Sequence, residues 1–280
     1  FQLFITRAFV GVIVTLTCLK YLNYKILVIP VYPKLTLIRC VLMHFGFFIF
    51  FISLEKLSLS TVTALFFAAP FFITILSALV LSEKIGLIRV LIIALGFIGV
   101  FLIVKPFKES EFSFFMLAPL FTAFSYAVAM VISKYTKENE NAFLQAFQQY
   151  SVSLLLSVIT YTIILVFPLD MIDKEEWRFI FGSIKFDNYN ILISIAILSI
   201  FGTLGMISLI HAYQVGSPIT NGPTEYVLLI LAIMNGYFFF GNIPDYLSLA
   251  GIILIILGGW ALFFREHKRN KMAGKNFGSL

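Results

Sequence analysis

The sequence predicts an all-α integral membrane protein, a bundle of ten helices in two inverted halves of five, with nine of the helices within this chain. Three observations lead to this prediction. The 280 residues are 60% hydrophobic and only 12% charged, whereas soluble domains carry about a quarter charged residues. The apolar residues form runs that match the roughly 30 Å thickness of a bilayer core. Two distant parts of the chain also have similar sequences.

Polar breaks divide the chain into apolar runs of about 20 residues, which is the length that a helix needs to cross a bilayer. The predicted spans are 1–20, 35–54, 59–82, 86–104, 112–133, 142–167, 189–212, 217–240 and 246–264. The breaks between the first five spans carry charges, at Lys20, Lys25 and Lys34, at Glu55 and Lys56, at Glu83 and Lys84, and at Lys105 and Lys108. These spans leave no room for a separate soluble domain.

The later spans are separated by the charged segment 134–141, a longer segment between Asp170 and Asp187, a turn at Gly216 and Ser217, and the polar residues 241–245. The segment between Asp170 and Asp187 contains a tryptophan and mixed charges. We expect a loop or an interfacial helix there, because tryptophan is enriched where a membrane meets water.

The distribution of Lys and Arg predicts the orientation of the chain. If the last span ends in the cytoplasm, most of the 20 basic residues fall in cytoplasmic loops or in the basic tail 267–280, as the positive-inside rule requires. Nine spans then place residue 1 outside. Because the chain starts at Phe1 without an initiator Met or a signal-peptide n-region, we expect that the first of ten helices is missing; a cleaved signal sequence is the alternative.

Several classes of function are not indicated by the sequence. It contains no GK[ST] phosphate loop, HExxH, CxxC or Gly-x-Ser-x-Gly motif, and its three histidines at 44, 211 and 267 are far apart. Cys18 and Cys40 lie in or beside apolar runs and are interpreted as packing residues. The basic residues are scattered at helix ends, which argues against nucleic-acid binding. We therefore expect no enzymatic activity, no cofactor and no metal site.

An internal repeat relates the two halves. The stretch Ser60 to Thr63 and the span after it resemble Ser217 to Thr220 and the span after those, and both are followed by a short polar break and a Gly-rich last span. An odd number of helices separates the copies, so equivalent helices cross the membrane in opposite directions. That is the inverted-repeat design of secondary carriers.

The stretches that carry this repeat, residues 57–106 (LSLSTVTALFFAAPFFITILSALVLSEKIGLIRVLIIALGFIGVFLIVKP) and residues 202–266, resemble the EamA branch of the drug/metabolite transporter superfamily. The resemblance implies two repeats, 1–106 and 107–266, with both termini cytoplasmic and a central cavity that opens alternately to either side. The resembled subgroup includes S-adenosylmethionine uptake carriers and exporters of amino acids and metabolites. An acidic residue often ends the ninth helix of the family, where this chain has Asn242; the first half retains Glu83.

Glu225 is the strongest candidate for a functional residue, because a carboxylate at membrane depth is costly unless it faces protein or water. It follows Gly222 and Pro223 within the span 217–240, and Pro70 lies near the equivalent place in the first half. Proline weakens a helix, so we expect a matched pair of weakened helices. Glu225 is predicted to bind a cationic substrate group or a coupling proton; a neutral buried glutamate is the structural alternative.

Other polar residues within the spans are predicted to bind substrate. They are His44, which is also a candidate for proton coupling, Arg39, Tyr126, Asn221, Thr224 and Tyr226. Each has a structural alternative: a packed histidine for His44, an orienting charge that snorkels to the cytoplasmic interface for Arg39, and hydrogen bonds between helices for the others.

The sequence therefore predicts a secondary transporter that moves a small organic metabolite, such as an amino acid or a nucleoside-like solute, across the inner (cytoplasmic) membrane by alternating access. The alternatives are an efflux carrier for metabolites or drugs, and a lipid-handling protein such as a flippase or an intramembrane enzyme. The expected partners are a small-molecule substrate and the lipid bilayer, with a homodimer as a further option.

Overall fold

The computed structural model describes residues 2–25, 29–57, 59–83, 86–104, 114–166, 189–241, 245–258 and 260–261, which are helical with short connections and contain no strand. The helices are α1 (Gln2–Tyr21), α2 (Pro33–Ser53), α3 (Leu59–Phe66), α4 (Ala69–Leu81), α5 (Leu87–Val104), η1 (Phe114–Met116), α6 (Leu117–Tyr135), α7 (Ala142–Val166), α9 (Tyr189–Val215), α10 (Pro218–Thr224), α11 (Val227–Phe240) and a last apolar helix, Tyr246–Gly258. The predicted loop between Asp170 and Asp187, Asn242 and the tail 267–280 lie outside the described residues.

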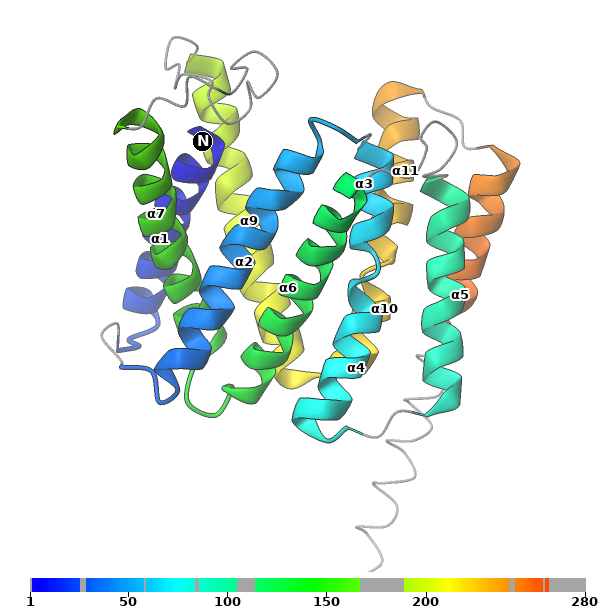
Figure 1. Cartoon of the computed structure of the whole chain (residues 1–280), viewed down its shortest axis with the longest axis horizontal. Coiled ribbons are helices and arrows are strands. Elements are labelled where there is room, and N and C mark those ends of the chain that lie inside the picture. Colours follow the sequence, from blue (N-terminus) through cyan, green and yellow to red (C-terminus); the bar gives the residue numbers. More distant parts are fainter. Residues whose placement is uncertain are drawn as a thin grey trace, which may run out of the picture.

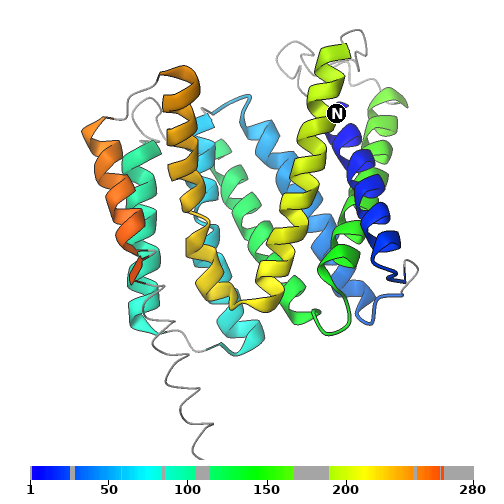
Figure 2. The same ribbon diagram turned by 180° about the vertical axis from the view of Figure 1, so that it is seen from behind.

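The helices form one bundle in which sequence neighbours mostly run in opposite directions (Figure 1). On one side α2 packs along α6, and α1 packs against α7 and α9. On the other side α10 packs on α4 and α5, and the helix Tyr246–Gly258 lies beside α5, as the view from behind also shows (Figure 2). The prediction of an all-α bundle is confirmed, and the predicted spans agree with the helices except where two of them are interrupted.

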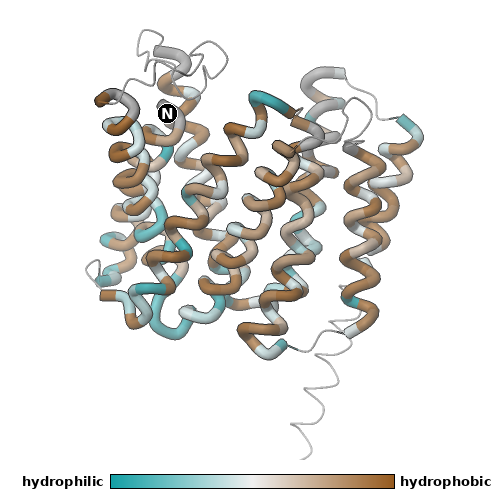
Figure 3. Tube along the Cα trace, in the orientation of Figure 1, coloured by the Kyte–Doolittle hydropathy of each residue, from teal (hydrophilic) through white to brown (hydrophobic). Residues whose placement is uncertain are grey.

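Length and hydropathy make this bundle a multi-pass membrane protein. Six described segments are long and apolar enough to cross a bilayer: Phe4–Tyr21, Pro33–Ser53, Val62–Leu81, Phe114–Tyr135, Ala142–Ile163 and Leu192–Val215. Large apolar side chains on the outside of the bundle are exposed, including Leu79 at 75% and Phe201 at 70%. Hydrophobic residues follow the length of the helices while hydrophilic ones gather near their ends (Figure 3). Soluble proteins rarely expose so much apolar surface to water. In a membrane, lipid chains cover this surface.

The third predicted span is broken into α3 and α4. Phe67 and Ala68 form a turn between the two helices, and Pro70 has no N–H to donate to the carbonyl four residues earlier. The N–H of Phe71 donates to the carbonyl oxygen of Ala68 at 3.0 Å and not to that of Phe67. The break therefore leaves the Phe67 carbonyl oxygen without its usual helical donor.

The eighth predicted span is broken in the same way, into α10 and α11. Pro223 lies inside α10, and Glu225 and Tyr226 form the turn. The N–H groups of Glu225 and Tyr226 donate to the carbonyls of Gly222 and Pro223 at 3.1 and 3.3 Å, which are the tighter three-residue bonds typical of a helix under strain. The expected matched pair of weakened helices is thus present as two real interruptions.

The two interrupted helices run in opposite directions and cross close to their breaks (Figure 1). A Cβ added at Gly222 would lie 3.4 Å from the backbone of Pro70, so the glycine lets α10 approach α4. The hydroxyl of Tyr226 donates to the free carbonyl oxygen of Phe67 at 3.4 Å. On the far side, Gly96 of α5 makes room for the ring of Tyr226, since a Cβ there would lie 2.4 Å from it.

Candidate functional site

Glu225 lies at the break between α10 and α11 and is held by tyrosines from two other helices. Its Oε1 accepts hydrogen bonds from the hydroxyl of Tyr126 on α6 at 2.7 Å and from that of Tyr213 on α9 at 2.5 Å. Two donated bonds offset part of the free energy needed to place a carboxylate in an apolar environment. The cluster Glu225, Tyr126 and Tyr213 is called the carboxylate cluster below.

Buried apolar residues surround the carboxylate cluster. Tyr126 and Tyr213 share a core with Met43 of α2 and with Ala69 and Ile73 of α4, directly after the other break. Residues of α4, α6, α9 and α10 therefore meet around the carboxyl group. A carboxylate in such a place needs a proton or a cation to balance its charge, so this arrangement suits the exchange of one for the other.

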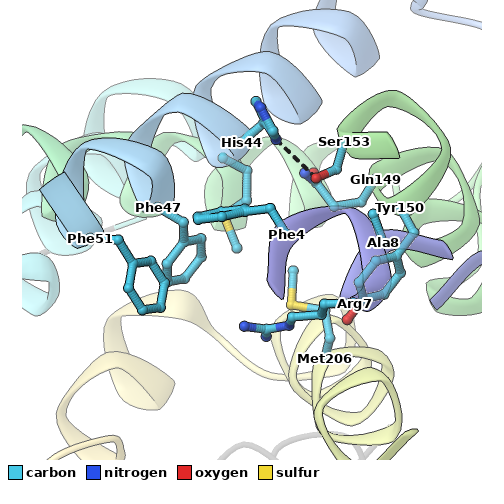
Figure 4. A pocket seen from close by; sticks show the side chains of 11 residues that line it. Phe4, Arg7, Ala8, His44, Phe47, Phe51, Gln149, Tyr150, Ser153 and Met206 are labelled. Carbon is cyan, nitrogen blue, oxygen red and sulfur yellow. Dashed lines mark hydrogen bonds between the residues drawn. The ribbon is translucent and has the colours of Figure 1, made fainter. Parts of the chain in front are cut away.

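A cavity of about 90 Å³ lies beside this core, between α1, α2, α7 and α9 (Figure 4). Its lining is largely apolar and aromatic, with a few polar side chains, and comprises Phe4, Arg7, Ala8, Met43, His44, Phe47, Phe51, Gln149, Tyr150, Ser153 and Met206. Nδ1 of His44 and Oγ of Ser153 are hydrogen-bonded at 2.9 Å. An apolar cavity with a few convergent polar groups is the usual form of a binding site for a small molecule.

Arg39 lies more than one helical turn from His44 along α2, in a different environment. It is 2% exposed, its two terminal nitrogens donate to the carbonyl of Gln145 at 3.3 Å, and Nη2 also donates to Oε1 of Gln148 at 2.8 Å. The alternative in which Arg39 snorkels to the interface is therefore wrong. Burial against α7 makes it a connector between helices at one end of the bundle.

More polar contacts close the same end of the bundle. Thr36 donates to the carboxylate of Glu140 at 3.1 Å, and Nε2 of Gln214 donates to the backbone carbonyl of Glu140 at 2.9 Å. Nζ of Lys134 donates to the carbonyls of Gln214 and Gly216 at 2.8 and 2.7 Å, at the C-terminal end of α9. Together with Arg39 these residues, called the end network below, join α2, α6, α7 and α9 at the end opposite to the N-terminus of α1.

The structure separates the other predicted site residues. Nδ2 of Asn221 donates to the carbonyl of Ala212 at 2.6 Å, and the hydroxyl of Thr224 donates to the carbonyl of Asn221 at 2.6 Å. Tyr226 is buried on the face of α10 and α11 that meets α5. Of the predicted residues, only Glu225 and Tyr126 share the carboxylate cluster, while His44 lies in the cavity and Arg39 in the end network.

Tyr213 of the carboxylate cluster and Arg7, Gln149 and Ser153 of the cavity are among the residues that were not predicted from the sequence. Tyr213 lies near the end of its predicted span, and Arg7 near the start of the first one, where they resemble interfacial residues. A signal for Tyr213 was available in its position one helical turn before Gly216, on the helix that leads into Ser217 and Glu225, but only the packing of α9 on α6 brings its hydroxyl to the carboxylate.

A multi-pass helical bundle with interrupted helices, a buried carboxylate and a small cavity is the architecture of a membrane transporter for small molecules. The chain belongs to the EamA-like transporter family, whose sequence model matches residues 1–105 and 113–264. The expected family resemblance is therefore confirmed. The family and the relatives found are transporters and not enzymes, which confirms that expectation as well.

Relatives with described roles include transporters of both directions. The chain is 24% identical to the S-adenosylmethionine uptake transporter of Rickettsia conorii, over 84% of this chain and 74% of that protein. It is 25% identical to the pseudopaline exporter CntI of Pseudomonas aeruginosa, over 76% of this chain and 69% of that one. A solved crystal structure that is 16% identical has a TM-score of 0.74 over 96% of this chain and 88% of its own, so the two share a fold.

Proposed function

We propose that this protein carries a small organic metabolite across the cytoplasmic membrane by alternating access, with Glu225 as the site that exchanges a coupling proton or a cationic substrate group. The observation that carries the proposal is the carboxylate cluster, in which Tyr126 and Tyr213 hold one oxygen of Glu225 at a helix break. Ionisable residues within a membrane are costly, so proteins rarely keep such a buried carboxyl group unless it has a function.

The two interrupted helices support the alternating-access part of the proposal. The breaks fall four residues after Thr63 and five residues after Thr220, at nearly equivalent places in the predicted repeats 1–106 and 107–266. Interrupted helices in corresponding positions of two halves mark the binding region of many secondary carriers. The close approach of Gly222 to Pro70 supports the proposal that one half moves against the other in this region.

The end network and the cavity support a state that is closed at one end. The end network lies at the end of the bundle that also carries the basic residues Lys20, Lys34 and Lys137. The positive-inside rule assigns this end to the cytoplasm. The cavity, lined by Phe4 and Phe51, lies nearer the opposite end. We propose that this conformation is closed to the cytoplasm and that the C-terminus also lies on the cytoplasmic side of an inner membrane.

Either direction of transport fits the proposed mechanism. Uptake is favoured by the resemblance to S-adenosylmethionine uptake transporters, and efflux by the resemblance to a pseudopaline exporter. Import of an amino acid, a nucleoside-like solute or a related metabolite is the first proposal. Export of such a metabolite is the second, and it uses the same site.

The test is transport by proteoliposomes that contain the full-length protein, in the presence or absence of a proton gradient. Labelled S-adenosylmethionine, amino acids and nucleosides are supplied inside or outside, so that both directions are measured. We expect saturable transport of one class of solute, reduced at least tenfold in Glu225→Gln and unchanged in the exposed control Glu138→Gln. Unchanged transport in Glu225→Gln would refute the assigned role of the carboxylate.

A further inference from the structure

Arg7 is a cation that lines the cavity and has no hydrogen-bond or ion-pair partner among the described residues. It lies in the second turn of α1, inside the apolar segment Phe4–Tyr21. No ion pair or hydrogen bond joins its guanidinium to any other residue of the described part of the chain. A charged group at membrane depth is retained only where it faces water, a partner or a ligand, and the cavity is where a ligand would reach Arg7.

The opposite side of the cavity offers an unused acceptor. In Figure 4, Arg7 and Met206 lie across the cavity from His44 and Ser153. Gln149, which also lines it and is 6% exposed, donates through Nε2 to the carbonyl of Cys40 at 3.2 Å. Its Oε1 is buried and has no hydrogen-bond partner in the described part of the chain, although buried amide oxygens nearly always have one. Among the described residues, Arg7 therefore has no counter-ion and Gln149 Oε1 has no hydrogen-bond donor.

The walls of the cavity define the rest of the ligand. Phe4 packs edge-on against Phe51, with ring centroids 5.3 Å apart, and Phe47 lies beside them in the lining. A single guanidinium balances a single negative charge, and its planar fork matches the two oxygens of a carboxylate. A phosphate carries more charge than this one cation balances. These features fit a ligand that has a carboxylate, a hydrogen-bond donor and an apolar group close together.

We propose that this cavity binds the α-amino-acid group of the transported solute, with Arg7 holding the carboxylate, Gln149 Oε1 accepting from the ammonium group, and the aromatic wall covering an apolar side chain. The inference rests on the proposed transport function and names the substrate class. The volume of about 90 Å³ fits a small amino acid or one end of a larger solute.

The cavity lies next to the carboxylate cluster. Met43, Phe47 and Met206 line the cavity and also belong to, or pack against, the core that contains Tyr126 and Tyr213. These side chains therefore contact both the cavity and the core that contains the two tyrosines of the carboxylate cluster. Methionine side chains adopt many conformations, so these side chains can rearrange when the solute moves toward the carboxylate.

The test is isothermal titration calorimetry on the purified full-length protein with three probes that differ by one group. They are L-leucine, L-leucinamide without the carboxylate, and 4-methylpentanoate without the ammonium group. We expect the wild type to bind L-leucine at least tenfold more tightly than either analogue. Arg7→Gln should weaken the binding of L-leucine at least tenfold and leave the binding of L-leucinamide unchanged. Gln149→Leu should weaken the binding of L-leucine but not that of 4-methylpentanoate.

The controls separate this inference from protein stability and from the transport proposal. Lys137→Gln removes an exposed cation and should bind all three probes as the wild type does. If Arg7→Gln is unstable, Arg7→Lys keeps the charge and should lose most of the preference for L-leucine over L-leucinamide. Equal wild-type affinities for L-leucine and L-leucinamide, or no binding of L-leucine, overturn the inference. Binding without transport of any solute would instead overturn the proposed function alone.

Discussion

The hydroxyl of Tyr226 donates a hydrogen bond to the carbonyl oxygen of Phe67, and this contact joins the breaks of the two crossing helices. Phe67 belongs to the predicted first repeat and Tyr226 to the second. The rings of the two residues also pack, with centroids 5.8 Å apart. A backbone carbonyl that one half cannot satisfy internally is thus satisfied by a side chain of the other.

Removing this hydroxyl should destabilise the protein modestly. Tyr226→Phe leaves the buried Phe67 carbonyl without its donor, and we expect a loss of about 1 kcal/mol in the free energy of unfolding. The same change at the 91% exposed Tyr246 is the matched control and should have no effect. Unfolding in a denaturant series, measured in detergent, checks both variants, and equal stabilities would contradict the assigned contact.

The crossing of α5 with the helix Tyr246–Gly258 depends on a pair of glycines. A Cβ at Gly251 would lie 2.6 Å from the carbonyl oxygen of Gly99, which cannot move away as a side chain does. We expect Gly251→Ala to destabilise by roughly 1–3 kcal/mol. Gly205→Ala, where no atom lies within 4 Å of the added Cβ, should be neutral or slightly stabilising. A Gly251→Ala protein with the wild-type unfolding midpoint would show that the helices do not cross here.

The tyrosines of the carboxylate cluster should affect transport in a coupled way. Tyr126→Phe and Tyr213→Phe each remove one donor from Glu225, and a hydrogen bond to a charged group contributes about 1.5–3 kcal/mol. Each variant should lower transport roughly tenfold or more, and the double variant should lower it by less than the product of the two. Tyr237→Phe, on an exposed face of α11, is the control. Independent effects that multiply would contradict a shared carboxylate.

Much of the fold was predictable, since the position of each span follows from local composition. The apolar runs predicted the helices to within a few residues, and Pro70 and Pro223 predicted the two weak points. The site was predicted less well, because it depends on which helix faces come together. Asn221 and Thr224 lie next to Glu225 in sequence, yet their side chains bond to nearby backbone carbonyls. Tyr213 and Arg7 reach their sites only through the packing of α9 and α1.

Arg39 is another residue whose surroundings could not be predicted from the sequence. Its place at the start of a span suggests an interfacial charge, but α7 covers it completely. Only the neighbouring helix reveals this, since the polar residues Gln145 and Gln148 that receive its hydrogen bonds lie more than a hundred positions further along the chain.

Opening of the end network should expose Cys40. This thiol is buried beside Arg39, while Cys18 is partly exposed and serves as an internal reference within the same molecule. We expect Arg39→Gln to raise the rate of maleimide labelling at Cys40 at least fivefold relative to Cys18, because the variant loses its bonds to α7. Mass spectrometry of the labelled peptides measures both rates. An unchanged ratio would mean that Arg39 does not hold this end closed.

Proton movement during transport is the direct test of the role proposed for Glu225. A pH-sensitive dye is enclosed in proteoliposomes, and the transported solute is added to the wild type, Glu225→Gln and the control Glu138→Gln. We predict a solute-dependent pH change in the wild type and in Glu138→Gln that is absent in Glu225→Gln. If Glu225 instead binds a cationic group of the solute, we predict that Glu225→Gln loses solute binding. Wild-type solute binding and an undiminished pH change in Glu225→Gln would contradict it.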